Sequence, residues 1–309
     1  MILIFVKRPG IRLGAAAVAV ALLAASCQSA PADDRPLVVV TTTVLGDLVA
    51  GVAGDAADVE VLMPIGVDPH DYQPSARQIA LIAAADLVVA NGLGLEEGLE
   101  DAMAGAAADG VVVLEVAPLV DPLPFAGGSD LDPHVWLDPV RMADAVGHIA
   151  DALAGVDPGA GFAERGAAVA ADLLAADATI RHLLAGVPEE ERLLVTNHEA
   201  LGYFADRYGF TVIGVVIPGG STLAEPSSAE LAALVAGIRD RGVPAIFVET
   251  TQPTALAEAV AAEVGGSIQV IELHTESLGA PGTPAAPLAG MLVEDARLIT
   301  AALGAPWTG

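Results

Sequence analysis

The sequence predicts an α/β protein with two parallel-sheet lobes, and three observations support that fold class. Short apolar segments rich in Val, Ile and Leu alternate with helical stretches along the chain. This alternation favours parallel strands joined by right-handed crossovers. The same succession occurs in each half of the chain, and one long Ala-rich helical stretch separates the halves. The length of 309 residues is sufficient for two domains of ordinary size.

Residues 1–27 have the layout of a secretory signal and are excluded from the fold. A basic start precedes a short apolar run over residues 13–25, which is too short to span a membrane as a lone helix. The sequence LAASC at residues 23–27 resembles a bacterial lipobox, in which the cysteine is lipidated and becomes the mature amino terminus. We therefore expect lipidation at Cys27, which is the only cysteine, followed by a polar tether over residues 28–35.

Four strands and three helices are predicted in the first half. Ser75 and Gln78 fit a capping box, in which each side chain accepts a backbone N–H of the other residue, so a helix is expected to begin at Ala76. The predicted strands cover residues 37–43, 59–63, 86–90 and 111–116, and the helices cover residues 44–52, 76–84 and 96–107.

A Pro-, Gly- and Asp-rich loop over residues 118–132 leads to a helix over residues 139–153. The long helical stretch over residues 162–184 follows, and we interpret it as the connection between the lobes. The first lobe is assigned to residues 36–157 and the connecting helix to residues 158–187.

The second half repeats the pattern, and the second lobe is assigned to residues 188–309. Ser227 and Glu230 fit another capping box at the start of a helix that ends at Arg241. The predicted strands cover residues 192–195, 210–216, 245–248 and 267–273, and the other helices cover residues 200–208, 254–264 and 291–303.

Three histidines, His70, His134 and His198, follow predicted strands or leave interdomain loops, and each directly precedes a helix. Ligands of open parallel sheets bind at the carboxyl ends of the strands. Imidazoles suit Zn²⁺ and neighbouring transition metals, and a carboxylate is the usual companion where cysteine is lacking. The carboxylates of Glu249 and Glu276 both qualify, because each follows a predicted strand of the second half. The role of His274 stays open.

The formal charge is −27, from 13 basic and 40 acidic residues. This charge disfavours nucleic acid and anionic membrane surfaces as partners, and it concentrates cations near the protein. A solvated acidic surface that keeps the protein soluble is an equally good interpretation.

Several motifs resemble, in order, those of the zinc and manganese solute-binding lipoproteins of metal ABC transporters (cluster A-I, or cluster 9). These motifs are V-D-P-H-D-Y-Q-P-S, D-P-H-V-W-L-D-P, T-N-H-E-A-L-G-Y-F, F-V-E-T and E-L-H-T-E-S-L-G. The resemblance implies a periplasmic-binding-protein-like fold, with the metal in the cleft between two lobes joined by one long helix.

The resemblance also implies a ligand set. Family motifs for the first three ligands match His70, His134 and His198, and Glu276 takes the place of the usual aspartate. Glu249 matches an acid beside the site, where it would orient an imidazole. Glu249 and His274 are alternatives for the fourth ligand.

Three imidazoles and one carboxylate favour Zn²⁺ over Mn²⁺ as the bound ion. The lack of histidine in the loop over residues 118–132 weakens the zinc prediction, because many zinc members carry a His-rich loop there. By resemblance, the protein would capture the ion as a monomer outside the cytoplasmic membrane, or in the periplasm, and deliver it to an ABC permease. Affinity is expected to fall below about pH 6 to 6.5, where imidazoles gain protons.

Two other functions remain open. A zinc hydrolase would use the three histidines with Glu199 or Glu249 as base, although the sequence lacks H-E-x-x-H. An adhesin-type surface lipoprotein, with a role in cell adhesion, would bind a macromolecule even after loss of His70 and His134. The resemblance favours a binding protein over an enzyme.

Overall fold

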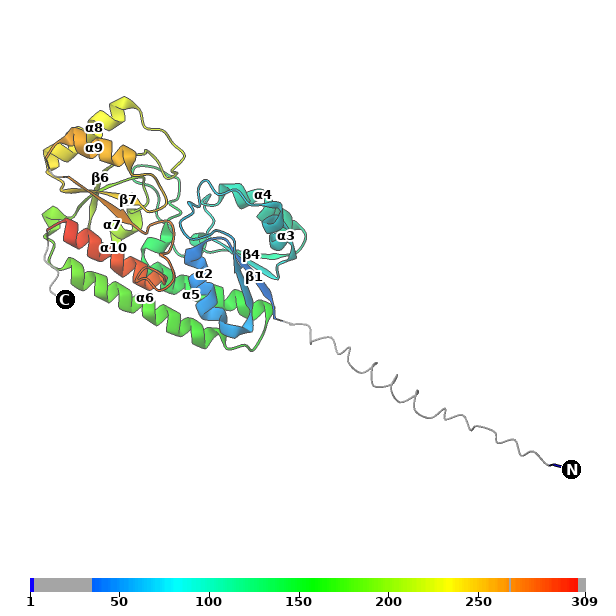
Figure 1. The fold of residues 1–309 in the computed structure, drawn as a ribbon. Helices are drawn as coiled ribbons and strands as arrows, with labels where there is room; N and C mark the ends of the chain where they lie inside the picture. Colours follow the sequence, from blue (N-terminus) through cyan, green and yellow to red (C-terminus); the bar gives the residue numbers. More distant parts are fainter. Residues whose placement is uncertain (3–34, 267, 305–309) are drawn as a thin grey trace. The chain divides into compact units, whose positions relative to one another are not determined.

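Two parallel sheets, one from each half of the chain, form the centres of two lobes (Figure 1). The strand order is β2-β1-β3-β4 in the first sheet and β6-β5-β7-β8 in the second, so the second half repeats the topology of the first. The first sheet comprises β1 (Leu37–Val40), β2 (Asp58–Val61), β3 (Leu87–Ala90) and β4 (Val112–Glu115). The second comprises β5 (Leu193–Thr196), β6 (Thr211–Val215), β7 (Ala245–Glu249) and β8 (Gln269–Leu273). The predicted fold class is confirmed.

This computed structural model describes residues 1–2, 35–266 and 268–304. Residues 3–27 of the predicted signal, including the lipidation site Cys27, and residues 28–34 of the tether lie outside these residues. Residues from Pro36 onward form one compact unit. Within the described part of the chain, no helix has both the length and the apolar character needed to cross a membrane.

Helices follow the strands nearly as predicted. The capping boxes at Ser75 and Ser227 are both formed, and they begin helices at the expected places. The first-half helices are α2 (Thr43–Ala53), α3 (Ala76–Ala84), α4 (Glu100–Ala108) and α5 (Pro139–Val156). After the connecting helix α6 (Phe162–Leu184) come α7 (Gly202–Tyr208), α8 (Ser228–Arg241), α9 (Ala255–Val264) and α10 (Leu288–Ala302).

Some element boundaries differ from the prediction. The first strand stops at Val40, because Thr42 caps α2 and its Oγ1 accepts from the Leu45 N–H at 3.2 Å. The helix expected over residues 96–107 starts as a 3₁₀ turn at residues 97–99. There the Glu96 carboxylate accepts from the backbone N–H of Asn91 and ties down the loop after β3.

One apolar cluster extends through both lobes, and each lobe also has a smaller cluster of its own. On β1, Val38 and Val40 face a cluster that continues into the second lobe, where it includes Phe247 and Met291. Val39 faces a separate cluster beneath α3 and α4, as the alternation of side chains along a strand requires. Another cluster lies beneath α8 and α9 of the second lobe. The lobes therefore share one continuous apolar core.

Helix α6 connects the lobes and packs against α2 and α5 of the first lobe and α10 of the second (Figure 1). Arginine side chains anchor both of its ends. Arg165 donates to the carbonyls of Val52 and Ala53 at the end of α2, at 2.7 and 3.0 Å. Arg192 donates to the Leu184 carbonyl at 3.2 Å, at the other end of α6. Contact with helices of both lobes along its length makes α6 a firm support for the cleft.

Candidate metal centre

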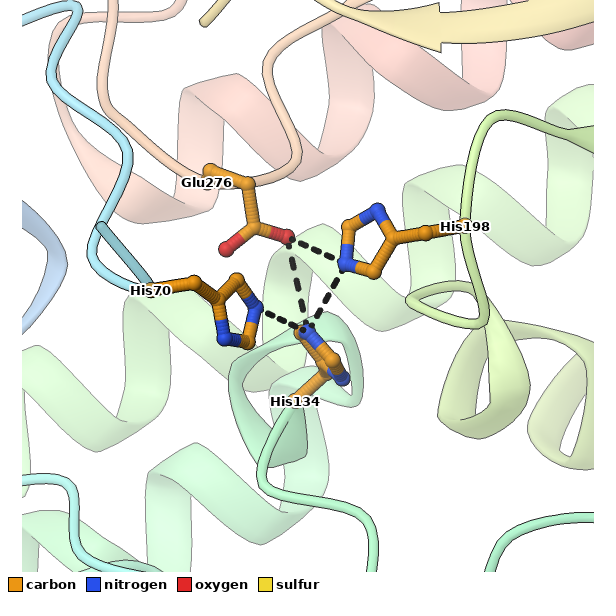
Figure 2. Close-up of side chains that lie close together, drawn as sticks. All are labelled: His70, His134, His198 and Glu276. Carbon is orange, nitrogen blue, oxygen red and sulfur yellow. Dashed lines mark hydrogen bonds and ion pairs between the residues drawn. The ribbon is translucent and has the colours of Figure 1, made fainter. Parts of the chain in front are cut away.

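Four side chains converge at the carboxyl ends of the two sheets (Figure 2). His70 lies in the loop between β2 and α3, and His134 directly precedes a 3₁₀ turn at residues 135–137 before α5. His198 follows β5 by two residues, and Glu276 follows β8 by three. All four are buried, with exposed fractions between 0% and 3%. Both lobes therefore contribute to the same site.

The donor atoms have the spacing of a compact coordination shell. His134 Nε2 lies 3.3 Å from His70 Nε2 and 3.1 Å from His198 Nε2. Glu276 Oε1 lies 3.6 Å from the Nε2 atoms of His134 and His198. Donors about 2.0 Å from a tetrahedral Zn²⁺ are separated by about 3.3 Å. One donor atom from each residue falls within 4.8 Å of all the others, so a single ion fits between them.

The two D-P-H triplets have a common local structure. Asp68 Oδ1 accepts the backbone N–H of His70 at 2.9 Å, and Asp132 Oδ1 accepts that of His134 at 2.9 Å. An aspartate that accepts from the backbone two residues later forms an Asx turn. The turn fixes the backbone of each histidine where it leaves the loop.

Carboxylates orient two of the imidazoles. His134 Nδ1 lies 2.7 Å from Asp132 Oδ1, and His198 Nδ1 lies 2.7 Å from Glu249 Oε1. A proton on each Nδ1 leaves the Nε2 lone pair free for a metal. The sequence-predicted acid Glu249 therefore contacts the outer nitrogen of His198, whereas Glu276 faces the inner nitrogens.

Glu276 is the least compensated group in the site. Both of its carboxylate oxygens are buried and have no hydrogen-bond partner within the described residues. Burial of an unpaired carboxylate is costly unless a cation or a proton neutralises it. Trp136 holds its loop, because the indole N–H donates to the carbonyl of the preceding residue Thr275 at 2.6 Å. An ion between the imidazoles would neutralise the carboxylate in place of a proton.

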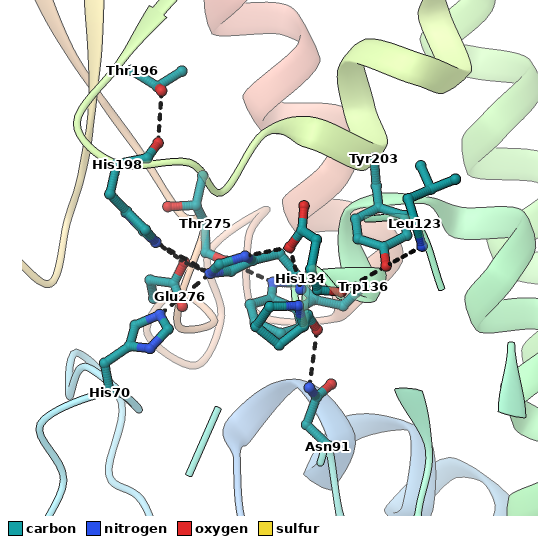
Figure 3. A network of polar contacts seen from close by, with 12 residues as sticks. His70, Asn91, Leu123, His134, Trp136, Thr196, His198, Tyr203, Thr275 and Glu276 are labelled. Carbon is teal, nitrogen blue, oxygen red and sulfur yellow. Dashed lines mark hydrogen bonds and ion pairs between the residues drawn. The ribbon is translucent and has the colours of Figure 1, made fainter. Parts of the chain in front are cut away.

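A wider network holds the turn of His134 from both lobes (Figure 3). Asn91 of the first lobe donates its side-chain N–H to the Pro133 carbonyl at 2.9 Å. Tyr203 of α7 donates its hydroxyl to the Asp132 carbonyl at 2.7 Å and accepts the Leu123 N–H. His134 therefore sits on a turn fixed at two successive carbonyls.

Burial and proximity change the pKa values of the donors. Burial, with the neighbouring His134, lowers the pKa of His70 to about 3. Burial also lowers the pKa of His134 well below its usual value. Burial opposes protonation of His198 too, but its hydrogen bond to Glu249 and the surrounding carboxylates raise its pKa to about 9. Burial raises the pKa of Glu276 to about 8. Among the four donors, His198 and Glu276 therefore hold protons most strongly.

His274 does not join the cluster. Its backbone N–H donates to Asp295 Oδ1 at 3.0 Å, and its Nδ1 lies 3.4 Å from Thr250 Oγ1. The group of potential donors in the described residues contains His70, His134, His198 and Glu276 without His274. The sequence alone does not predict the supporting roles of Asp68, Asp132 and Trp136, which hold the histidines and the loop of Glu276. The repeated D-P-H triplet is a signal for the two aspartates.

A buried site of three imidazoles and one carboxylate, placed between two α/β lobes on a common helix, defines a solute-binding protein for a metal ion. The family model described as "Zinc-uptake complex component A periplasmic" matches residues 38–302. The chain therefore belongs to this family of metal ABC transporter solute-binding proteins.

Individual relatives cover nearly the same part of the chain. The zinc-binding protein TroA of Treponema pallidum is 34% identical over 284 residues, which are 89% of this chain and 91% of TroA. The manganese-binding lipoprotein MntA of Halalkalibacterium halodurans is 32% identical over 273 residues, which are 86% of this chain and 89% of MntA. The solved structure of periplasmic zinc-binding TroA matches with a TM-score of 0.82 at 33% identity, covering 87% of this chain and 99% of that one.

Proposed function

We propose that this protein captures Zn²⁺ outside the cytoplasmic membrane and delivers it to an ABC permease for import. The ligands are His70, His134, His198 and Glu276. The observation that carries the proposal is the convergence of three imidazole Nε2 atoms on Glu276, a buried carboxylate without a hydrogen-bond donor among the described residues. A cation at this point satisfies all four groups at once.

Zn²⁺ is preferred over Mn²⁺ because the donor set is rich in nitrogen. Nitrogen donors favour later metals of the first row, whereas Mn²⁺ binds best to carboxylates, carbonyls and water. Relatives include proteins named for zinc and for manganese, so relationship alone does not decide the ion. The ligand chemistry of this chain supports zinc.

Capture and release fit this site better than hydrolysis. A hydrolytic zinc site keeps one coordination position open for water. Here Glu276 supplies a fourth protein donor and fills that position. Glu249, the candidate base, is hydrogen-bonded to His198 Nδ1 and does not face a water position. Delivery then requires withdrawal of a ligand, which a permease can achieve by moving one lobe relative to the other.

The proposed location follows from the amino terminus and the family. We propose cleavage before Cys27, lipidation of that cysteine and a tether over residues 28–35. The lobes are assigned to residues 36–157 and 188–309, with residues 158–187 as the connection. A monomer anchored at the outer face of the cytoplasmic membrane could load one ion at a time.

The deciding experiment measures metal content and competitive affinity for Zn²⁺ and Mn²⁺ on the chain from Gln28. We expect one tightly bound Zn²⁺ per chain, lost or strongly weakened in His134→Ala and Glu276→Ala. Full affinity in Glu276→Ala would contradict the ligand set, and a preference for Mn²⁺ would contradict the choice of ion. His148→Ala, on α5 and outside the site, is the matched control and should bind normally.

A further inference from the structure

The carboxylate of Asp68 contacts both lobes. Its Oδ1 accepts the backbone N–H of His70 at 2.9 Å within the first lobe. Its Oδ2 accepts the hydroxyl of Thr222 at 2.6 Å and the side-chain N–H of Gln252, which both belong to the second lobe. Asp68 is itself buried, with 4% exposed. One side chain therefore connects the position of His70 to the position of the opposite lobe.

The two donors come from separate loops. Thr222 lies between β6 and α8, and Gln252 lies between β7 and α9. Asp68 itself does not belong to the group of His, Cys, Asp and Glu side chains that could hold a metal ion. The contact is therefore an addition to the metal site and not a part of its coordination shell.

Asp132 shows what the turn alone requires. It occupies the same place in the second D-P-H triplet, and its Oδ1 accepts both the backbone N–H and the ring Nδ1 of His134. The Asx turn thus needs only one carboxylate oxygen in each triplet. The two hydrogen bonds at Asp68 Oδ2 are therefore not needed for the turn, and they join the first lobe to the second.

A second bond fastens the same loop nearby. The backbone N–H of Gly66 donates to Ser277 Oγ at 2.8 Å, and Ser277 directly follows Glu276. The loop that carries His70 is therefore attached to the second lobe on two sides. Separation of the lobes must break these bonds before His70 can move away from His198 and Glu276.

We propose that Asp68 is an interlobe latch, a positioning residue that keeps His70 in the metal site while the lobes are closed and so slows release of the ion. This inference rests on the proposed function, since it takes His70 as a ligand. The latch acts on release more than on capture, because its bonds must break as the lobes separate. Hydrogen bonds to a carboxylate are stronger than those between neutral groups, so their loss should be measurable.

The test removes the second-lobe donors and leaves Asp68 bound to His70. In the chain from Gln28, Thr222→Val with Gln252→Leu should increase the rate of Zn²⁺ dissociation about ten- to a hundredfold. The association rate should change less than about threefold, as is usual for variants of one site. Stopped-flow transfer of Zn²⁺ to a chromophoric chelator measures both the rate and the amount released.

Two further variants isolate the mechanism. Asp71→Asn removes a negative charge from an exposed position in the same loop and should leave the dissociation rate unchanged. Asp68→Ala should accelerate release at least as much as the double variant, and combining all three changes should accelerate it no further than Asp68→Ala alone. If the triple variant released Zn²⁺ faster than Asp68→Ala by the full factor of the double variant, the latch would be overturned. The same holds if Asp71→Asn accelerated release as much as the double variant does.

The readouts separate this inference from the proposed function. If wild type fails to bind Zn²⁺, or His70→Ala keeps full affinity, the proposed function is wrong. If wild type binds and the double variant releases Zn²⁺ at the wild-type rate, only the latch is wrong. A merely structural role would lower the melting temperature of the metal-free double variant without changing the release rate of the loaded protein, and this result too would overturn the latch.

Discussion

His198 Nδ1 lies 2.7 Å from Glu249 Oε1, and this pairing raises the pKa of the His198 imidazole. The carboxylate holds the imidazole so that Nε2 faces His134 at 3.1 Å. Despite burial, the hydrogen bond and the surrounding negative charge raise the pKa of His198 to about 9. The acid that orients the imidazole therefore also strengthens its hold on a proton.

Metal affinity should consequently depend on pH over a higher range than ordinary histidines predict. Bound metal requires deprotonated His198 and Glu276, whose pKa values are raised to about 9 and about 8. As pH falls through these values, protons compete with the ion, so affinity should decline below about pH 9 rather than only below pH 6.5. Competition titrations with Zn²⁺ between pH 6 and 9.5 measure this, and a constant affinity above pH 6.5 would contradict it.

Glu249→Gln should move that pH dependence. Without the negative charge the pKa of His198 should fall, so affinity should level off at a lower pH. At pH 9 the variant should bind Zn²⁺ about ten- to a hundredfold more weakly than wild type, as is usual when the partner of a ligand imidazole is lost. Glu225→Gln, an exposed acid of the same lobe, is the charge-matched control. Equal pH profiles for both variants would exclude the pairing as the cause.

Trp136→Phe tests how the loop of Glu276 is held. The change keeps the aromatic ring and removes the N–H that donates to the Thr275 carbonyl at 2.6 Å. We expect about tenfold weaker Zn²⁺ binding, because loss of one buried hydrogen bond is worth about 1 kcal/mol or more. In a Glu276→Ala background the same change should have no further effect, and calorimetric titration can compare the four proteins. A full tenfold loss in that background would assign Trp136 another role.

Asp295→Asn should change stability in a pH-dependent way. Burial raises the pKa of Asp295 to about 7, and its Oδ2 has no hydrogen-bond partner among the described residues. At about pH 4 the carboxyl is protonated in the folded chain and only partly ionised in the unfolded chain, so the substitution should have a small effect. As pH rises towards 7 the unfolded chain ionises first, and the wild-type fold loses stability that the amide would keep.

We therefore expect Asp295→Asn to raise the free energy of unfolding by up to about 4 kcal/mol at pH 8, because the pKa is raised by about three units at about 1.4 kcal/mol each. Urea unfolding of the metal-free protein at pH 4 and pH 8 measures the difference. Asp240→Asn, on the exposed surface of α8, should have no such dependence. A gain that is equal at both pH values would show that the pKa of Asp295 is the same in the folded and the unfolded chain.

The fold follows from local signals to a large extent. The bounds of α3 and α6 agree with those predicted, because a capping box marks the start of α3 and a long Ala-rich stretch makes α6. The first strand is predicted three residues too long, since β-branched threonines suit a strand but Thr42 instead caps α2. This boundary is mispredicted because threonine is favourable both within a strand and at the N-cap of a helix.

The site follows from the sequence only in part. The two D-P-H triplets and His198 mark three strand ends or loops that meet, but Glu249 and Glu276 both follow strands and cannot be ranked from position alone. Packing places Glu276 toward the Nε2 atoms and Glu249 on the opposite nitrogen of His198. The contacts of Trp136 and Asp68 join residues 139 and 154 positions apart, respectively, and no local pattern encodes such pairs.

The donors at positions 70, 134, 198 and 276 divide the chain into long intervals, and each lobe contributes only part of the set. In an unfolded chain, closing loops of this length to gather four side chains is entropically unfavourable. Metal binding therefore depends on the folding of both lobes. With the proposed ligands, a chain in which only one lobe has folded would therefore bind the ion weakly, and a tightly bound ion requires both lobes to be folded and in contact.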